Sequence, residues 1–102
     1  MPNPDSLRSE ANRLRQEAES KERHAQDIEQ HLRAQQQTIQ NMERTRQDWQ
    51  NRLHQLEMQL AATADLSQSR AINSQIQDAT RKLMDQDRQI QTARNEYDKL
   101  LH

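Results

Sequence analysis

The chain contains no glycine, no cysteine and no phenylalanine, and it has only one tryptophan and one tyrosine. Without glycine it cannot form the glycine-rich loops that cradle phosphate groups, and without cysteine it has no disulfide, no thiol nucleophile and no cysteine metal ligand. Hydrophobic residues make up 30% of its 102 residues, which is too few for an ordinary globular core. Long helices that bury narrow stripes are the class that remains.

Long apolar runs and an excess of one charge are also lacking. No apolar run approaches the roughly 20 residues that a membrane-spanning helix needs, so we expect a soluble, cytoplasmic protein with no membrane partner. The formal net charge is -1, with 15 basic and 16 acidic residues that interleave along the chain, which gives no electrostatic basis for binding nucleic acid. Because paired helices offer no concave site, we expect no enzyme activity, catalytic residue, metal, cofactor or small-molecule ligand.

Apolar residues recur at alternating spacings of four and three through the first 60 residues, as in the seam of a coiled coil. Lys21, Gln35 and Arg46 are the large polar exceptions. A second stripe of the same spacing covers the last third of the chain, with Gln86 as its large polar member. The first seam consists of Leu7, Ala11, Leu14, Ala18, Ala25, Ile28, Leu32, Ile39, Met42, Trp49, Leu53, Leu56 and Leu60, and the second of Ile72, Ile76, Ala79, Leu83, Ile90, Ala93, Tyr97 and Leu100.

The two seams differ in register by two residues, which corresponds to a rotation of about 200° around a helix. One continuous helix would place them on opposite faces, so we predict a break between them, although a parallel dimer of unbroken helices is an alternative. Asp65 can cap a new helix, with Gln68 three residues later as in a capping box, and Thr63 is an alternative cap. Asn3 and Pro4 suit the start of the first helix.

These signals predict an all-α fold in which a long helix is followed by a shorter helix that folds back beside it. The predicted parts are an N-terminal tail at residues 1–3, a first helix from residue 4 to about 62, a turn at about residues 63–66 and a second helix to about 101. Residues 32–102 then form an antiparallel coiled-coil hairpin. Residues 4–31 form an overhang of the first helix.

In this hairpin, two residues that face each other across the seam, one from each helix, have numbers that add up to 132. The register places Trp49 opposite Leu83 and Arg46 opposite Gln86. Because a matched polar layer excludes slipped pairings, we expect Arg46 and Gln86 to define the register, at some cost in stability.

Charges at the flanks of the predicted hairpin oppose this register. They bring Arg52 near Lys82 and Glu43 near Asp87, with no compensating opposite pairs. Exposed ion pairs are worth less than about 1 kcal/mol each, whereas a buried Leu or Ile contributes roughly 1.5–3 kcal/mol, so the seam should prevail.

The overhang leaves an uncovered apolar stripe, and an isolated helix is marginal in water. A second copy of the chain can cover this stripe if it runs antiparallel, with a twofold axis between Glu19 and Ser20. Two residues that face each other, one from each copy, then have numbers that add up to 39. Opposite charges then meet on both flanks, in the pairs Arg8 with Glu29, Arg15 with Glu22, Glu10 with His31 and Glu17 with His24. The predicted interface consists of Leu7, Ala11, Leu14, Ala18, Ala25, Ile28 and Leu32, flanked by Arg8, Arg15, Glu22 and Glu29.

The resulting elongated homodimer resembles in layout the antiparallel coiled coil of tripartite-motif proteins and the hairpin stalks of type III and flagellar export systems. No sequence motif of either family accompanies this layout, so the resemblance assigns no residue roles. We expect a structural or adaptor protein that bridges two contacts at its hairpin tips, where Leu66 is the candidate contact. The alternative is a helical component or chaperone of an export apparatus that binds a different protein through residues 7–31.

Overall fold

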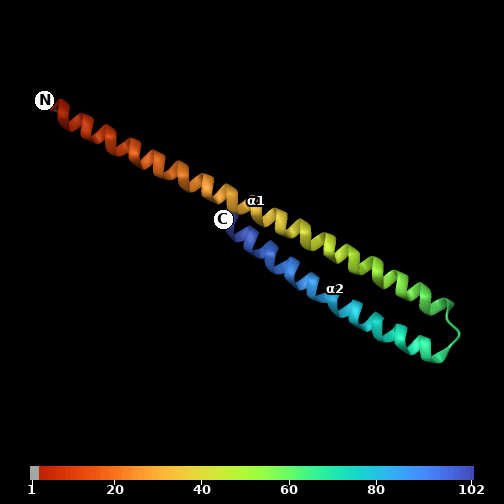
Figure 1. Ribbon diagram of the computed structural model, residues 1–102. Coiled ribbons are helices and arrows are strands. Elements are labelled where there is room, and N and C mark those ends of the chain that lie inside the picture. The colour runs from red at the N-terminus through yellow and green to blue at the C-terminus, as the bar shows by residue number, and fades with distance from the viewer. Residues whose placement is uncertain (1–2) are drawn as a thin grey trace. The chain divides into compact units, whose positions relative to one another are not determined.

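A computed structural model describes residues 3–102 and contains two α-helices in that range (Figure 1). α1 spans Pro4–Ala62 and α2 spans Leu66–Leu101, with residues 63–65 between them. The helical hairpin predicted from the sequence is confirmed, and the helix bounds agree with the predicted ones.

The start of α1 is capped by Asn3, as its sequence predicts. The Asn3 Oδ1 atom accepts a hydrogen bond of 3.0 Å from the Asp5 N–H, and its carbonyl oxygen accepts one of 3.1 Å from the Leu7 N–H. Pro4 occupies the first helical position, where a missing N–H costs nothing because it would have no partner in the helix. The other two residues of the predicted tail lie outside the described part of the chain.

The turn connects two helices without a glycine, because side chains satisfy the free backbone groups at both helix ends. At the end of α1, the Thr63 hydroxyl donates to the Gln59 carbonyl at 2.6 Å, and the Thr63 N–H donates to the Leu60 carbonyl at 3.2 Å. Thr63 therefore closes α1 and does not cap α2. No residue in the described chain has a positive φ, so the turn requires no left-handed backbone.

Asp65 is the N-cap of α2, with an extended backbone of φ -81° and ψ 123°. Its carboxylate accepts a hydrogen bond of 2.9 Å from the Ser67 N–H, and its carbonyl accepts one of 2.9 Å from the Ser69 N–H. This geometry is that of a capping Asp, in which the side chain replaces a helical acceptor that the first turn lacks.

The chain divides into two compact units, of which the second is Gln35–His102 and the first comprises the residues before it. The boundary lies three residues after the predicted start of the hairpin at residue 32. In the second unit, α2 runs antiparallel beside the second half of α1 (Figure 1).

Burial within the second unit follows the predicted seams except at Leu100, which is 40% exposed. All eight seam positions of α1 from Gln35 to Leu60 are at least partly buried, whereas every other residue of α1 in this unit is exposed. On α2 the partly buried stripe extends from Ser69 to Tyr97, and Thr80 alone departs from the spacing. The most buried side chains are Leu56 at 1%, Ala79 at 2%, Ala93 at 4% and Ile90 at 6% exposed.

Candidate functional site

The predicted interface on the first unit is an accessible apolar stripe. Leu7 and Leu14 are 52% and 54% exposed, and Ala18 and Ala25 are also exposed. The other members, Ala11, Ile28 and Leu32, are half-buried.

The charged residues that flank this stripe are exposed as well. Glu22 accepts a hydrogen bond of 3.5 Å from Gln26, and Arg23 lies 4.0 Å from Glu19 one turn away. Both are weak contacts between neighbouring turns of one helix, so they leave the flanking charges available to a partner.

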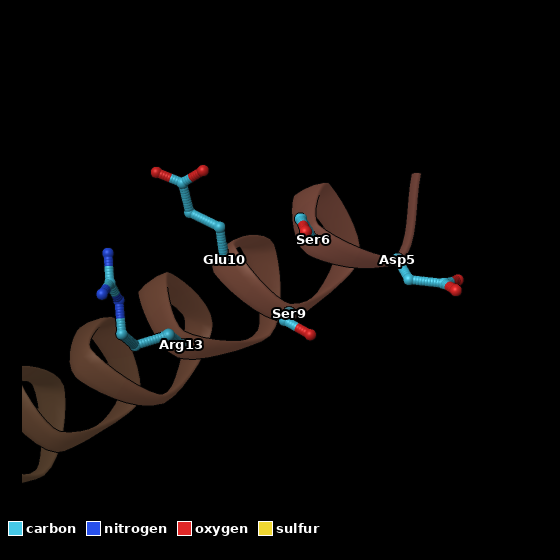
Figure 2. Close-up of a pocket in the computed structure, with 5 residues that line it drawn as sticks. All are labelled: Asp5, Ser6, Ser9, Glu10 and Arg13. Atoms are coloured by element: carbon cyan, nitrogen blue, oxygen red, sulfur yellow. The ribbon is translucent and has the colours of Figure 1, made fainter. Parts of the chain in front are cut away.

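An open hollow lies along the first turns of α1, lined by Asp5, Ser6, Ser9, Glu10 and Arg13. Figure 2 shows that Glu10 and Arg13 extend to one side of the helix while Asp5 extends to another. All five residues are exposed and come from a single helix, so no second wall encloses a ligand. The hollow has none of the convergence of polar groups that marks an active site.

The residues predicted to define the hairpin register lie together, but their contacts differ from the expected ones. Arg46 forms an ion pair with Asp87 and donates to the Gln50 side chain at 3.4 Å. Gln86 is half-buried, and its Oε1 atom has no hydrogen-bond partner. The long aliphatic stem of arginine explains the difference, because it can cover the seam while the guanidinium leaves it for a flanking carboxylate.

Trp49 and Leu83 are both half-buried seam residues. The Lys82 Nζ atom lies 4.3 Å from the centroid of the Trp49 ring, a distance at which the ring face attracts a cation. Lys82 thus has a partner that the sequence analysis missed.

The expectation of like charges without compensation at the hairpin flanks is wrong. Glu43 accepts a hydrogen bond of 2.6 Å from Arg94, and Arg52 donates to Gln75 at 3.3 Å. Side chains on a helix lean toward its N-terminus, so on antiparallel helices Glu43 and Arg94 lean toward each other and meet across a diagonal. Glu43 therefore contacts Arg94 and not Asp87, which the predicted register places near it.

These two contacts lie on opposite flanks of the hairpin and specify its register. The residue numbers of Arg52 and Gln75 add up to 127, and those of Glu43 and Arg94 add up to 137. The two values are symmetric about 132, the sum expected for the seam layers.

At the open end of the hairpin, the predicted register places Gln35 opposite Tyr97, and both side chains hydrogen-bond across the seam, although not to each other. The Gln35 Nε2 atom donates to the Ala93 carbonyl at 3.0 Å and to Glu96 at 3.3 Å. The neighbouring Gln36 donates to the Tyr97 hydroxyl at 2.9 Å. A glutamine at a seam position is the available signal, because its amide can donate to a carbonyl or a carboxylate of the facing helix.

The tip of the hairpin is apolar and nearly uncharged. Leu66 is 65% exposed and Met58 is 61% exposed, and Ala61, Ala62 and Ala64 are exposed between them. Asp65 is the only charged residue from position 58 to position 69, and its carboxylate already caps α2.

Within residues 3–102, no group of three or more acidic, histidine or cysteine residues could hold a metal ion. Over the same residues, neither helix has an apolar stretch long enough to cross a membrane. The prominent features of this chain are therefore two helix surfaces, the stripe on the first unit and the apolar tip of the second.

No protein-family model, no curated protein and no solved structure matches the chain. Its function is therefore inferred from these two surfaces.

Proposed function

We propose that this chain is a non-enzymatic structural or adaptor protein that forms a homodimer through residues 7–32 of α1. The observation that carries the proposal is the exposure of Leu7 and Leu14 at 52% and 54%, on the same spacing that is at least partly buried on α1 from Gln35 to Leu60. A helix with an exposed apolar stripe gains stability from a partner helix, because isolated helices are marginal in water.

A second copy in antiparallel orientation complements the stripe. In the register in which layers add up to 39, Leu7 faces the partner's Leu32, Ala11 faces the partner's Ile28 and Leu14 faces the partner's Ala25. Large residues thus oppose small ones in the Ala11 and Leu14 layers, which favours close packing there. The central layer sets Ala18 against the partner's Lys21 and is only weakly apolar.

A parallel pair of the same helices is less favourable. It would place Lys21 against the partner's Lys21 inside the seam, and two like charges that are partly desolvated repel each other. It would also oppose Ala11 with the partner's Ala11 and Leu14 with the partner's Leu14, so that narrow and wide layers alternate along the seam.

Dimerisation would join two hairpins in one complex and so present two copies of the apolar tip. Met58 and Leu66 are the large exposed apolar residues there, and exposed apolar side chains amid small neutral residues are suited to contact another protein. The proposed role is to link two equivalent partners through these tips, and the expected cytoplasmic location is part of the proposal.

The proposal is tested by the substitution Leu14→Asp in the full chain. Sedimentation equilibrium at micromolar concentrations should give twice the 12.1 kDa chain mass for the unmodified protein and the single mass for the variant, because the new carboxylate would be buried in the seam without a partner. Circular dichroism should show that the variant keeps the helical hairpin.

The matched control is Gln16→Asp, which adds the same charge on the opposite face of the same helix and should leave the dimer intact. An unmodified chain that remains monomeric at high micromolar concentration would overturn the homodimer. That outcome would instead favour binding of residues 7–31 to a helix of a different protein, as in the alternative of an export-apparatus component.

A further inference from the structure

We infer that the hairpin binds a third helix, supplied by another protein, along one of its two flanks. This helix places two large apolar side chains, fourteen residues apart, into two hollows between α1 and α2. The hollows lie within the second unit and include neither the stripe on the first unit nor the apolar tip, so the inference goes beyond the proposed function.

The two hollows have equivalent linings. The first has a volume of about 350 Å³, and its lining includes Thr38, Met42, Gln89 and Ala93. The second has a volume of about 180 Å³, and its lining includes Arg52, Leu56, Gln75 and Ala79. Each of these residues lies fourteen positions from its counterpart in the other hollow. Because fourteen residues are two heptads, both hollows face the same side of the hairpin and lie about 21 Å apart.

The hollows arise at two small seam residues of α2. Ala79 and Ala93 are 2% and 4% exposed, and an alanine side chain ends at Cβ, where a leucine would extend into the space beside it. Midway between the two alanines the seam contains the larger Gln86, and on the flank the Lys82 side chain lies over the Trp49 ring. These larger side chains separate one hollow from the other.

The opposite flank is a poor site for a third helix. The ion pairs that join α1 and α2 in the described chain both lie there, and they are Glu43 with Arg94 and Arg46 with Asp87. A helix laid over this flank would remove four charges from water, which costs several kcal/mol per ion when they are fully buried. Among the described residues, no ion pair joins the two helices on the flank that contains the hollows.

A third helix on the flank with the hollows would complete the burial of the seam. Met42 and Trp49 line the first and the second hollow, and both are only half-buried. Large side chains inserted beside them would remove more apolar surface from water, as knobs do in the holes of a coiled coil. A helix with large apolar residues fourteen positions apart matches the distance between the hollows.

The charges of this flank determine the charge of the bound helix. Lys82 is exposed and has no ion-pair partner in the described chain, so a glutamate midway between the two apolar side chains of the partner would complement it. Each hollow is lined by one cation and one carboxylate, which are Arg88 and Glu96 in the first and Arg52 and Asp78 in the second. The ends of the site therefore select neither sign of charge.

The test uses a synthetic three-heptad helical peptide with leucines fourteen positions apart and a glutamate midway, added to the full chain. Trp49 is the only tryptophan and lines the second hollow, so its emission should shift to shorter wavelength as the peptide covers it. Fluorescence anisotropy of the labelled peptide measures the dissociation constant. A control peptide with leucines sixteen positions apart presents them about 160° apart around the helix, and it should bind about tenfold more weakly.

Matched variants of the chain locate the peptide. Gln89→Glu places a charge in the first hollow and should weaken binding about tenfold. Gln91→Glu adds the same charge about 200° around α2 and should leave binding unchanged. Lys82→Glu should weaken binding of the glutamate peptide, and a peptide with lysine midway should recover it.

The outcomes separate this inference from the proposed function. Equal binding of the two peptides, no binding of either, or binding that Q89E does not weaken would overturn the inference. Binding that is lost in Leu14→Asp would place the peptide on the stripe of the first unit and would overturn it as well. Sedimentation equilibrium without peptide tests the homodimer independently, and the Q89E variant should give the same mass as the unmodified chain.

Discussion

Four side chains in the hairpin are nearly inaccessible to solvent, and they are small or medium in size: Leu56, Ala79, Ile90 and Ala93. Two helices alone cannot enclose a side chain from every direction, so most seam residues remain half-buried. Ala79 and Ala93 are buried because their small side chains let the facing helix approach closely. Leu56 is buried because its larger side chain fills the space between the two helices. The stability of the hairpin should therefore be concentrated in a few positions.

We predict that Leu56→Ala lowers the free energy of unfolding by about 2–5 kcal/mol, because it removes buried methyl groups and leaves a cavity. Urea denaturation followed by circular dichroism measures this change. Met58→Ala is the control two residues away, where the side chain is 61% exposed, and it should change stability by less than about 0.5 kcal/mol. Equal effects at the two positions would show that Leu56 does not pack in the core.

At the scale of the helices, the elements and their order could be predicted because each depends on local chemistry. Asn3 and Asp65 cap the helices, the turn follows from a two-residue change of register, and the buried stripes follow the apolar spacing. Contacts between the charged side chains beside the seam could not be predicted in the same way, because a long side chain can reach several neighbours. Arg46 illustrates this, since its guanidinium leaves the predicted layer with Gln86 and pairs with Asp87.

The same distinction applies to the candidate interface. The sequence identifies which residues form its stripe, and the structure places Leu7 and Leu14 where a partner could reach them. The occupant depends on a second molecule, which no spacing within one chain can specify.

We predict that Glu43 and Arg94 stabilise the antiparallel arrangement as a pair. Glu43→Arg and Arg94→Glu should each destabilise the hairpin, and the double exchange should recover most of the loss. The coupling should be less than about 1 kcal/mol because both side chains are about half exposed, and it should shrink at high salt. Denaturation of the four proteins in a double-mutant cycle measures it.

The control for this cycle is Glu57→Arg, which lies two heptads from Glu43 on the same flank and has no ion-pair partner in the described chain. It should alter stability little. A coupling of zero between Glu43 and Arg94 would contradict the flanking contact and leave the register supported by the seam alone.

At the scale of the whole molecule, the chain combines one unit that buries its own stripe with one that leaves its stripe exposed. Gln35–His102 has two helices that cover each other. Residues 4–34 form a single helical segment in which Leu7 and Leu14 remain about half exposed. If the proposed homodimer forms, folding and association belong to different parts of the chain.

We predict that a fragment of residues 35–102 folds cooperatively and stays monomeric at concentrations at which the full chain dimerises. Its unfolding in urea should not depend on protein concentration, whereas that of the full chain should. Sedimentation equilibrium and circular dichroism provide the two measurements. A fragment that self-associates as tightly as the full chain would place the dimer contact on the hairpin.

The alternation of four and three in the buried stripes also constrains how such a molecule can change in length during evolution. Adding one residue to a helix rotates everything beyond it by about 100° and turns the stripe out of the seam. Adding seven restores the stripe to within about 20° and lengthens the helix by about 10.5 Å. Because both helices of the hairpin share one seam, a heptad gained by α1 between Gln35 and Leu60 must be matched by a heptad in the facing part of α2. Lineages of this hairpin should therefore differ in size by paired insertions or deletions of fourteen residues in total, placed symmetrically about the turn.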